Sequence, residues 1–152
     1  MPIKVDDDGV GGSVTDQLNA AGYNVIPVSA ARKANAVEIY PNRRSELWFS
    51  VAERARDNEL DLSGILRDTE GNETHMIDEE VLEEIKRQAM ALTWLLDSRG
   101  RRVVCSKDEQ KQKLGRSPDG MDALNLAYAE TPEGADALPE ILTARQSPLG
   151  RR

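Results

Sequence analysis

The sequence predicts an α/β fold, mainly because of the order of its apolar segments. A short apolar strand near the N-terminus turns through glycines into a helical segment, and a second apolar strand follows directly. Longer amphipathic helices come after these elements. A strand, helix, strand unit closes as a right-handed crossover with parallel strands, so an α/β sandwich is the expected architecture.

The N-terminal part of the chain supplies the first strand, helix and strand. Residues 2–6 are typical of a strand whose end carries Asp6, and a glycine-rich turn follows it. Residues 14–21 have apolar side chains at helical spacing, and Gly22 stands where a C-terminal cap belongs. Residues 23–29 contain an apolar run of the kind found in buried strands, so they are predicted to pair with the first strand.

Two amphipathic helices are predicted in the middle of the chain. The first covers residues 40–60 and the second covers residues 78–89. The stretch between them, residues 61–76, is rich in turn residues and lacks periodicity, which predicts a loop. The side chains expected to face the core are Leu47, Trp48, Val51 and Ala55 in the first helix, and Val81, Leu82, Ile85 and Ala89 in the second.

A β-hairpin and a short basic helix are predicted next. Residues 91–96 and 101–105 flank the turn DSRG, which is typical of two antiparallel strands. Ser106 and Glu109 then match a capping box, which begins a helix that ends near Gly115.

A last helix and a tail complete the chain. Ser117 is the expected N-cap and Pro118 the first helical residue. Residues 131–152 have weak periodicity and several prolines, so a flexible C-terminal tail is predicted after a domain of residues 1–130. The two tryptophans, Trp48 and Trp94, stand in apolar contexts and are expected in the core. The apolar side of the last helix is expected to hold Met121, Leu124, Ala127 and Tyr128.

The composition limits the possible chemistry. The chain has 152 residues, 39% of them hydrophobic, which suits one globular domain. It contains neither a run of about 18 apolar residues nor a secretory leader, so we expect a cytoplasmic protein. Cys105 is the only cysteine and His75 the only histidine, which excludes an internal disulfide and a zinc cluster of cysteines and histidines. Any metal ion must therefore be held by oxygen atoms.

Three aspartates could supply those oxygen atoms. Asp119 and Asp122 are three residues apart, so a helix places both carboxylates on one face, where a cation between them would offset their repulsion. Asp6 ends a strand, and ligands collect at strand ends in open α/β sheets. Mg²⁺ or Mn²⁺ suits this donor set. The alternatives are a capping role for Asp119 and a phosphate-binding role for the glycine-rich turn, which lacks the lysine of a P-loop.

The basic residues are clustered. A net charge of -7 argues against a chain that binds nucleic acid over its whole surface, although one basic site remains compatible with DNA. The segment that precedes the aspartate pair carries Lys107, Lys111 and Arg116, and we expect these residues to bind DNA phosphates. The alternative is that these side chains form a solvated helix face.

Three segments resemble, in order and spacing, the C-terminal nuclease domain of tailed-phage terminase large subunits. They are VDDDGVGGSVTDQL, YPNRRSELW and SKDEQKQKLGRSPDGMDALNLAYA. The resemblance implies an RNase H-like fold and a two-metal-ion endonuclease that cuts concatemeric phage DNA during genome packaging. It further implies Mg²⁺ or Mn²⁺ as cofactor, double-stranded DNA as substrate, the terminase small subunit and the portal protein as partners, and the host cell cytoplasm as location.

The resemblance also assigns residues. Asp6 matches the second acidic ligand of the family, and Asp119 and Asp122 match the final acidic motif, with the principal ligand of the two left open. In the family, the first catalytic aspartate lies on a strand that precedes the one carrying Asp6, and we expect this chain to lack that strand. We therefore expect an incomplete fold that lacks the first strands of its sheet, carries a β-hairpin insertion and can form homo-oligomers. The isolated chain should have little or no nuclease activity, and the alternative is a non-catalytic remnant or assembly module.

Overall fold

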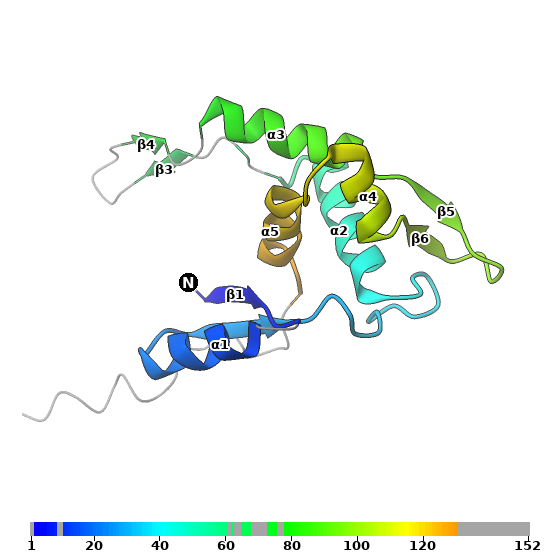
Figure 1. Ribbon diagram of the computed structural model, residues 1–152. Helices are drawn as coiled ribbons and strands as arrows, with labels where there is room; N and C mark the ends of the chain where they lie inside the picture. The colour runs from blue at the N-terminus through cyan, green and yellow to red at the C-terminus, as the bar shows by residue number, and fades with distance from the viewer. Residues whose placement is uncertain are drawn as a thin grey trace, which may run out of the picture. The chain divides into compact units, whose positions relative to one another are not determined.

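A computed structural model gives the structure of the protein and describes residues 2–8, 11–60, 62, 65–67, 73–75 and 78–130 (Figure 1). The chain divides into two compact units: the N-terminal residues up to Val28 belong to one, and Ser29–Ala129 form the other. The predicted tail, residues 131–152, and the domain boundary before it lie outside the described residues. None of the described helices is both long and apolar enough to cross a membrane.

The N-terminal unit is the predicted strand, helix and strand. It contains β1 (Ile3–Asp6), α1 (Gly11–Ala20) and β2 (Val25–Val28). The two strands pair in parallel, as predicted, with Ile3 opposite Val25 and Asp6 opposite Val28. Gly22 has a φ of 86°, the left-handed conformation expected after the helix. The helix begins at Gly11, three residues earlier than expected, because the glycines that were assigned to the turn continue into it.

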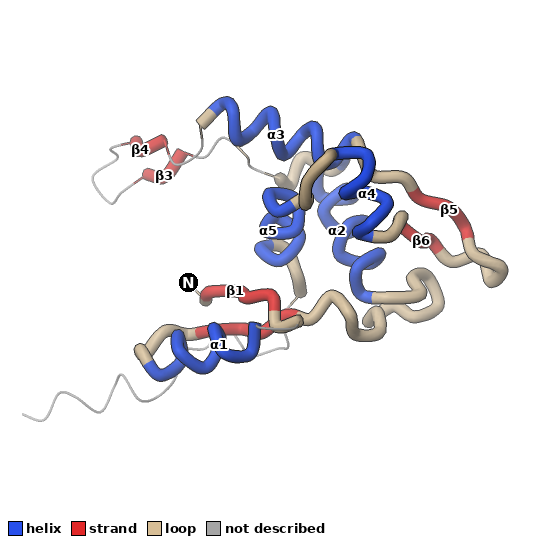
Figure 2. Tube along the Cα trace, in the orientation of Figure 1, coloured by secondary structure: helices blue, strands red, loops and turns tan. Residues whose placement is uncertain are grey.

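The second unit is built mainly from helices (Figure 2). They are α2 (Arg43–Arg56), α3 (Glu79–Met90), α4 (Lys107–Leu114) and α5 (Asp119–Ala127). The core joins three helices and one strand, and its fully buried members are Trp48, Val51, Ile85, Val104 and Met121. Side chains of this size stabilise a fold by about 1.5 to 3 kcal/mol each when they leave water.

Two hairpins accompany these helices. The predicted hairpin is confirmed: β5 (Trp94–Leu96) pairs antiparallel with β6 (Arg102–Val104). The loop predicted for residues 61–76 was wrong in part, because β3 (Ile65–Arg67) and β4 (Glu73–His75) form an antiparallel pair there. Each of these strands has only three residues, too few to show alternation in the sequence.

The predicted inner faces need correction. Leu47, Trp48, Val51, Ile85 and Met121 are buried as expected. Four residues predicted to face the core are exposed instead: Ala55, Val81, Ala89 and Ala127. Five polar residues of α2 to α5 are buried: Arg43, Ser45, Gln88, Gln110 and Asn125. Apolar spacing alone therefore gave the presence of each helix but not the full set of residues that it buries.

Two further corrections concern the C-terminal half. Trp94 is 55% exposed, so it was wrongly assigned to the core. The N-cap of α5 is Pro118, one residue later than predicted. The capping box of Ser106 and Glu109 is confirmed, and α4 ends at Gly115 with a φ of 73°.

Candidate metal and DNA site

The two C-terminal aspartates lie in the first turn of α5. Asp119 is its first residue and is exposed, whereas the Asp122 side chain is 23% exposed. The amide of Asp122 donates to the carbonyl oxygen of Pro118 at 2.9 Å, so both aspartates belong to regular helix. The prediction that both stand on one helix three residues apart is confirmed.

Two cations of the protein itself flank Asp122. Lys107 Nζ lies 2.6 Å from Asp122 Oδ2, and Arg44 Nη1 lies 3.6 Å from Asp122 Oδ1. From the sequence, a metal ion was expected to compensate the charge of this carboxylate, and in the structure these two side chains contribute to that compensation. Asp122 Oδ2 is buried and lacks a hydrogen bond of good geometry within the described residues, so charge attraction dominates its contact with Lys107.

Arg44 is held in place by buried groups. Its Nη2 atom donates to Gln110 Oε1 at 2.7 Å, and its guanidinium carbon lies 5.7 Å from the centroid of the Trp48 ring. Gln110 is fully buried and donates through Nε2 to the carbonyl oxygen of Gln88 at 3.2 Å. A buried amide that uses both its donor and its acceptor fixes its neighbours in one geometry. The position of Arg44 is therefore set by α4 as well as by α2.

The start of α5 is fixed against α3. The amide of Met121, one of the first-turn groups that has no partner within the helix, donates to Gln88 Oε1 at 2.9 Å. A Cβ atom on Gly120 would lie 3.0 Å from Ile85 Cγ1 and 3.2 Å from Gln88 Oε1, so the two helices approach closely at this glycine. Two contacts with α3 therefore determine the position of the helix end that carries Asp122.

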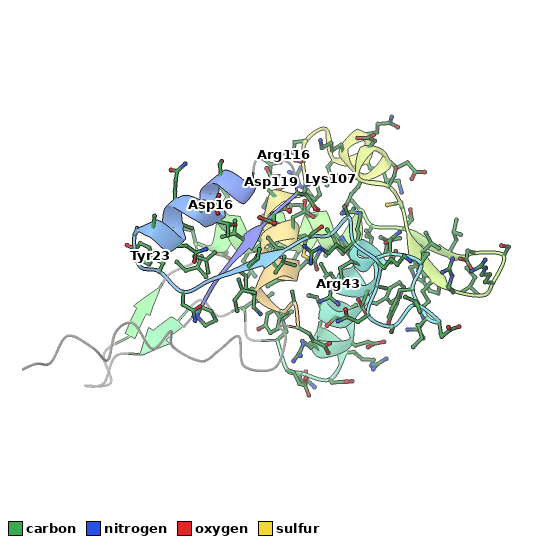
Figure 3. All side chains as sticks on the ribbon, turned by 90° about the horizontal axis from the view of Figure 1, so that it is seen from below. Asp16, Tyr23, Arg43, Lys107, Arg116 and Asp119 are labelled. Atoms are coloured by element: carbon green, nitrogen blue, oxygen red, sulfur yellow. The ribbon has the colours of Figure 1, made fainter. Side chains whose placement is uncertain are left out.

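Two of the predicted phosphate-binding residues, Lys107 and Arg116, lie near Asp119 at the start of α5 (Figure 3). Lys107 and Lys111 are one turn apart on α4, and Arg116 lies in the connection between the two helices. Lys111 is exposed. Arg116 Nη2 lies 2.5 Å from Glu84 Oε2, so this guanidinium already has an anionic partner on α3.

Glu84 is a strongly acidic group. The hydrogen bond from Gln88 and then that from Arg116 lower its pKa to about 2. Gln88 Nε2 donates to Glu84 Oε1 at 2.8 Å. The carboxylate therefore links the cationic connection before α5 to the buried glutamine that holds the start of this helix.

Asp6 belongs to the other unit. It is exposed at the end of β1, where its Oδ1 atom accepts a hydrogen bond from the amide of Asp8 at 3.1 Å. Its neighbour Asp7 accepts a hydrogen bond from Thr15 Oγ1 at 3.2 Å, which ties α1 to the strand end. The meeting of Asp6 with the α5 aspartates stays a prediction, because the two lie in different units.

The local chemistry of the α5 pair fits a hard divalent cation. Carboxylate oxygens are the ligands that Mg²⁺ and Mn²⁺ prefer, and Asp122 Oδ2 is a buried oxygen with no hydrogen bond in the described part of the chain. Within that same part, no group of three or more histidine, cysteine, aspartate or glutamate side chains is close enough together to hold a metal ion. The pair on α5 therefore needs a further ligand for a complete site.

Solved structures share this arrangement of elements. The nuclease domain of the large terminase subunit gp2 of bacterial virus Sf6 superposes with a TM-score of 0.63 at 21% identity, which covers 86% of this chain and 66% of that domain. A mutant of the same domain with manganese gives a TM-score of 0.62 at 20% identity. A mutant form from bacteriophage Sf6 with calcium gives the same values and is covered over 65% of its length. The chain has the fold of a terminase nuclease domain.

The likeness confirms the RNase H-like fold class. About a third of the Sf6 domain has no counterpart in this chain, which agrees with the expected incompleteness of the fold. No protein-family model and no curated protein matches the chain.

Three residues of the site were not predicted from sequence. Arg43 and Arg44 are the first two residues of α2 and belong to the segment YPNRRSELW, but nothing in the sequence indicated that Arg44 rather than Arg43 would reach Asp122. Gln88 and Gln110 stand among charged residues on polar helices, where a glutamine ordinarily faces water. Only the packing of α3, α4 and α5 against one another turns these two side chains inward.

Proposed function

We propose that this chain is a nuclease segment of a phage terminase large subunit, whose complete form cuts concatemeric DNA during genome packaging. One observation carries the proposal. The Asp122 carboxylate, whose buried Oδ2 has no hydrogen bond of good geometry among the described residues, stands between the cations of Lys107 and Arg44 at the start of α5, in a fold shared with a terminase nuclease domain. Such a mixture of carboxylates and cations suits a divalent metal ion and the phosphates of DNA.

The residues have separate roles in this proposal. Asp6, Asp119 and Asp122 would hold Mg²⁺ or Mn²⁺, which supplies activation of water and stabilisation of the leaving oxygen in phosphodiester hydrolysis. The phosphates of DNA would be contacted by Lys107 and Lys111 of α4 and by Arg116, which follows this helix. Arg44 holds the Asp122 carboxylate through its charge, and Gln110 orients Arg44.

We also propose a substrate, partners and a location for the complete enzyme. In the complete enzyme the substrate is double-stranded DNA, the terminase small subunit and the portal protein are partners, and the host cell cytoplasm is the location. We further propose that the isolated chain forms homo-oligomers, because the described strands pair only two by two and have open edges.

Metal binding tests the assignment most directly. We expect Mn²⁺ to raise the melting temperature of the full chain, and we expect Asp122→Asn to remove that rise because it deletes a ligand charge. Asp16→Asn, an exposed aspartate on α1, is the control and should keep the full Mn²⁺ effect. A melting temperature that responds to Mn²⁺ equally in both variants would contradict the metal role of Asp122. A plasmid-nicking assay with Mn²⁺, on this chain and on an N-terminally extended form, then tests activity.

A second candidate function is a non-catalytic remnant or assembly module. It is favoured by the ion pairs of Asp122, since Lys107 and Arg44 offset this charge without a metal ion. Under this alternative, Mn²⁺ leaves the melting temperature unchanged and the extended form does not nick plasmid DNA.

A further inference from the structure

The β5–β6 hairpin exposes an apolar strand. Trp94, Leu95 and Leu96 are 55%, 62% and 59% exposed, although all three are large hydrophobic residues. The hairpin extends away from α2 and α4 within its unit (Figures 1 and 2). Contiguous exposed apolar side chains of this kind are typical of an interaction site rather than of an ordinary surface.

The outer edge of β5 is open. Within the described strands, β5 pairs only with β6, and Leu95 stands opposite Val103. Hydrogen bonds from Cys105 to the Thr93 carbonyl, at 2.7 Å, and from Asp97 to the Arg101 carbonyl, at 2.9 Å, show which residues face β6. Because backbone groups alternate along an antiparallel strand, those of Trp94 and Leu96 face the open edge.

A hollow lies beside the hairpin. It has a volume of about 500 Å³, and Trp94, Leu95 and Val103 form its apolar wall. Asn42 and Arg44 line it from the start of α2, and Ser106 and Glu109 from the start of α4. The hollow gives room for side chains of a segment that lies along β5.

Cationic side chains stand at both ends of β5. Lys113 Nζ donates to Thr93 Oγ1 at 2.9 Å, which places an ammonium group just before the strand. Arg99 and Arg101 follow the strand in the turn, where Arg101 pairs with Asp97 at 2.8 Å and Arg99 is exposed. Lys113 stands near Glu109, which lines the hollow, whereas Arg99 is exposed, so the turn is the cationic end of the strand in a chain whose net charge is -7.

From this juxtaposition we propose that the open edge of β5 is a docking site for an extended peptide segment of a partner protein. The segment adds as a third strand and has an apolar centre with an acidic residue at the end that meets the turn. Main-chain hydrogen bonds to Trp94 and Leu96 supply register, as in other cases of strand addition. The acidic residue meets Arg99, and the apolar centre covers Leu95 and Leu96. This role does not depend on metal binding at α5.

Fluorescence anisotropy tests the proposal with a labelled peptide of about ten residues, which has valines at its centre and glutamates at both ends, so that one glutamate meets the turn in either strand direction. We expect saturable binding to the full chain. The double variant Leu95→Ser with Leu96→Ser should weaken binding by about tenfold or more, because the contact area at the centre is lost. Arg99→Glu should weaken it further at low salt. Met90→Ser, which changes an 86% exposed side chain on α3, is the matched control and should bind as the unchanged chain does.

Two altered peptides separate the contributions. A peptide with N-methylated central residues should lose binding if backbone hydrogen bonds are made, and a peptide with lysines in place of the glutamates should bind weakly. Absence of binding by the glutamate peptide, or equal weakening by Met90→Ser, overturns the proposal. It is also overturned if duplex DNA binding or chain dimerisation, measured by sedimentation velocity, is lost in the Leu95 and Leu96 double variant, because another occupant then holds the edge.

Discussion

Two regions of the second unit reverse the usual distribution of polar and apolar side chains. At the contact of α3, α4 and α5, the amide side chains of Gln88 and Gln110 are buried. On the β5–β6 hairpin, Trp94, Leu95 and Leu96 are exposed. Burial of an amide is tolerated only where its hydrogen bonds are made, and both glutamines make theirs. Exposure of apolar side chains needs no such compensation within the chain, which leaves them available to a partner.

Substitutions in these two regions should therefore differ in how much they reduce stability. In the buried region a change removes contacts that hold other residues in place, including the cation beside Asp122. At Leu95 and Leu96 of the hairpin, which are mostly exposed, a change removes little buried area. We therefore expect stability to depend on the first region and binding on the second.

The largest effect is expected for Gln110→Met. This change keeps the volume of the side chain but leaves Nη2 of Arg44 and the carbonyl oxygen of Gln88 without their partner. The free energy of unfolding should fall by roughly 2 to 3 kcal/mol, as for other buried polar groups that lose a partner. Urea unfolding measures it. Gln112→Met, an exposed glutamine of the same helix, is the control and should change stability by about 0.5 kcal/mol or less. Equal losses in both variants would show that Gln110 has no special role.

Lowering the pH is expected to have a moderate effect on the free energy of unfolding. The hydrogen bonds of Gln88 and Arg116 lower the pKa of Glu84 from about 4.5 to about 2, so the unfolded chain binds a proton at this group more readily than the folded chain. The stability that Glu84 contributes is complete above about pH 4.5 and is lost as the pH falls toward about 2. Urea unfolding at several pH values in this window should show a shallower decline for Glu84→Gln than for the unchanged chain. Parallel pH profiles would contradict the assigned ion pair.

The smallest effect on stability is expected for the double variant Leu95→Ser with Leu96→Ser. Both side chains are mostly exposed, so the free energy of unfolding should change by about 0.5 kcal/mol or less. The fluorescence of an added apolar dye such as ANS should fall, because the exposed apolar area is reduced. A large loss of stability would show that the hairpin supports the fold, and the contrast between the two regions would then fail.

Local features of the site could be predicted because they depend on near neighbours in the sequence. The capping box of Ser106 and Glu109 and a helix end near Gly115 were expected and are present, and Gly115 adopts the left-handed conformation. The spacing of Asp119 and Asp122 on one helix was also expected. Each of these features is decided within a few residues by backbone sterics and hydrogen bonds.

The partners of Asp122 could not be predicted in this way. Arg44 precedes it by many residues, and its approach depends on how α2 packs against α5. The inward orientation of Gln110 depends on α3, which supplies the carbonyl oxygen that it binds. The exposure of Trp94 likewise depends on what packs against the hairpin, and its sequence context is apolar in either case.

The sequence by itself determined the order and type of most elements, the glycine caps, and the aspartate pair at the start of α5, because local sterics, capping and periodicity act over a few residues. The tertiary structure alone decided which cations meet Asp122, which glutamines are buried and which apolar strand stays open. These outcomes result from contacts between segments far apart in the chain, where a side chain is buried only if a distant partner can pack against it or complete its hydrogen bonds.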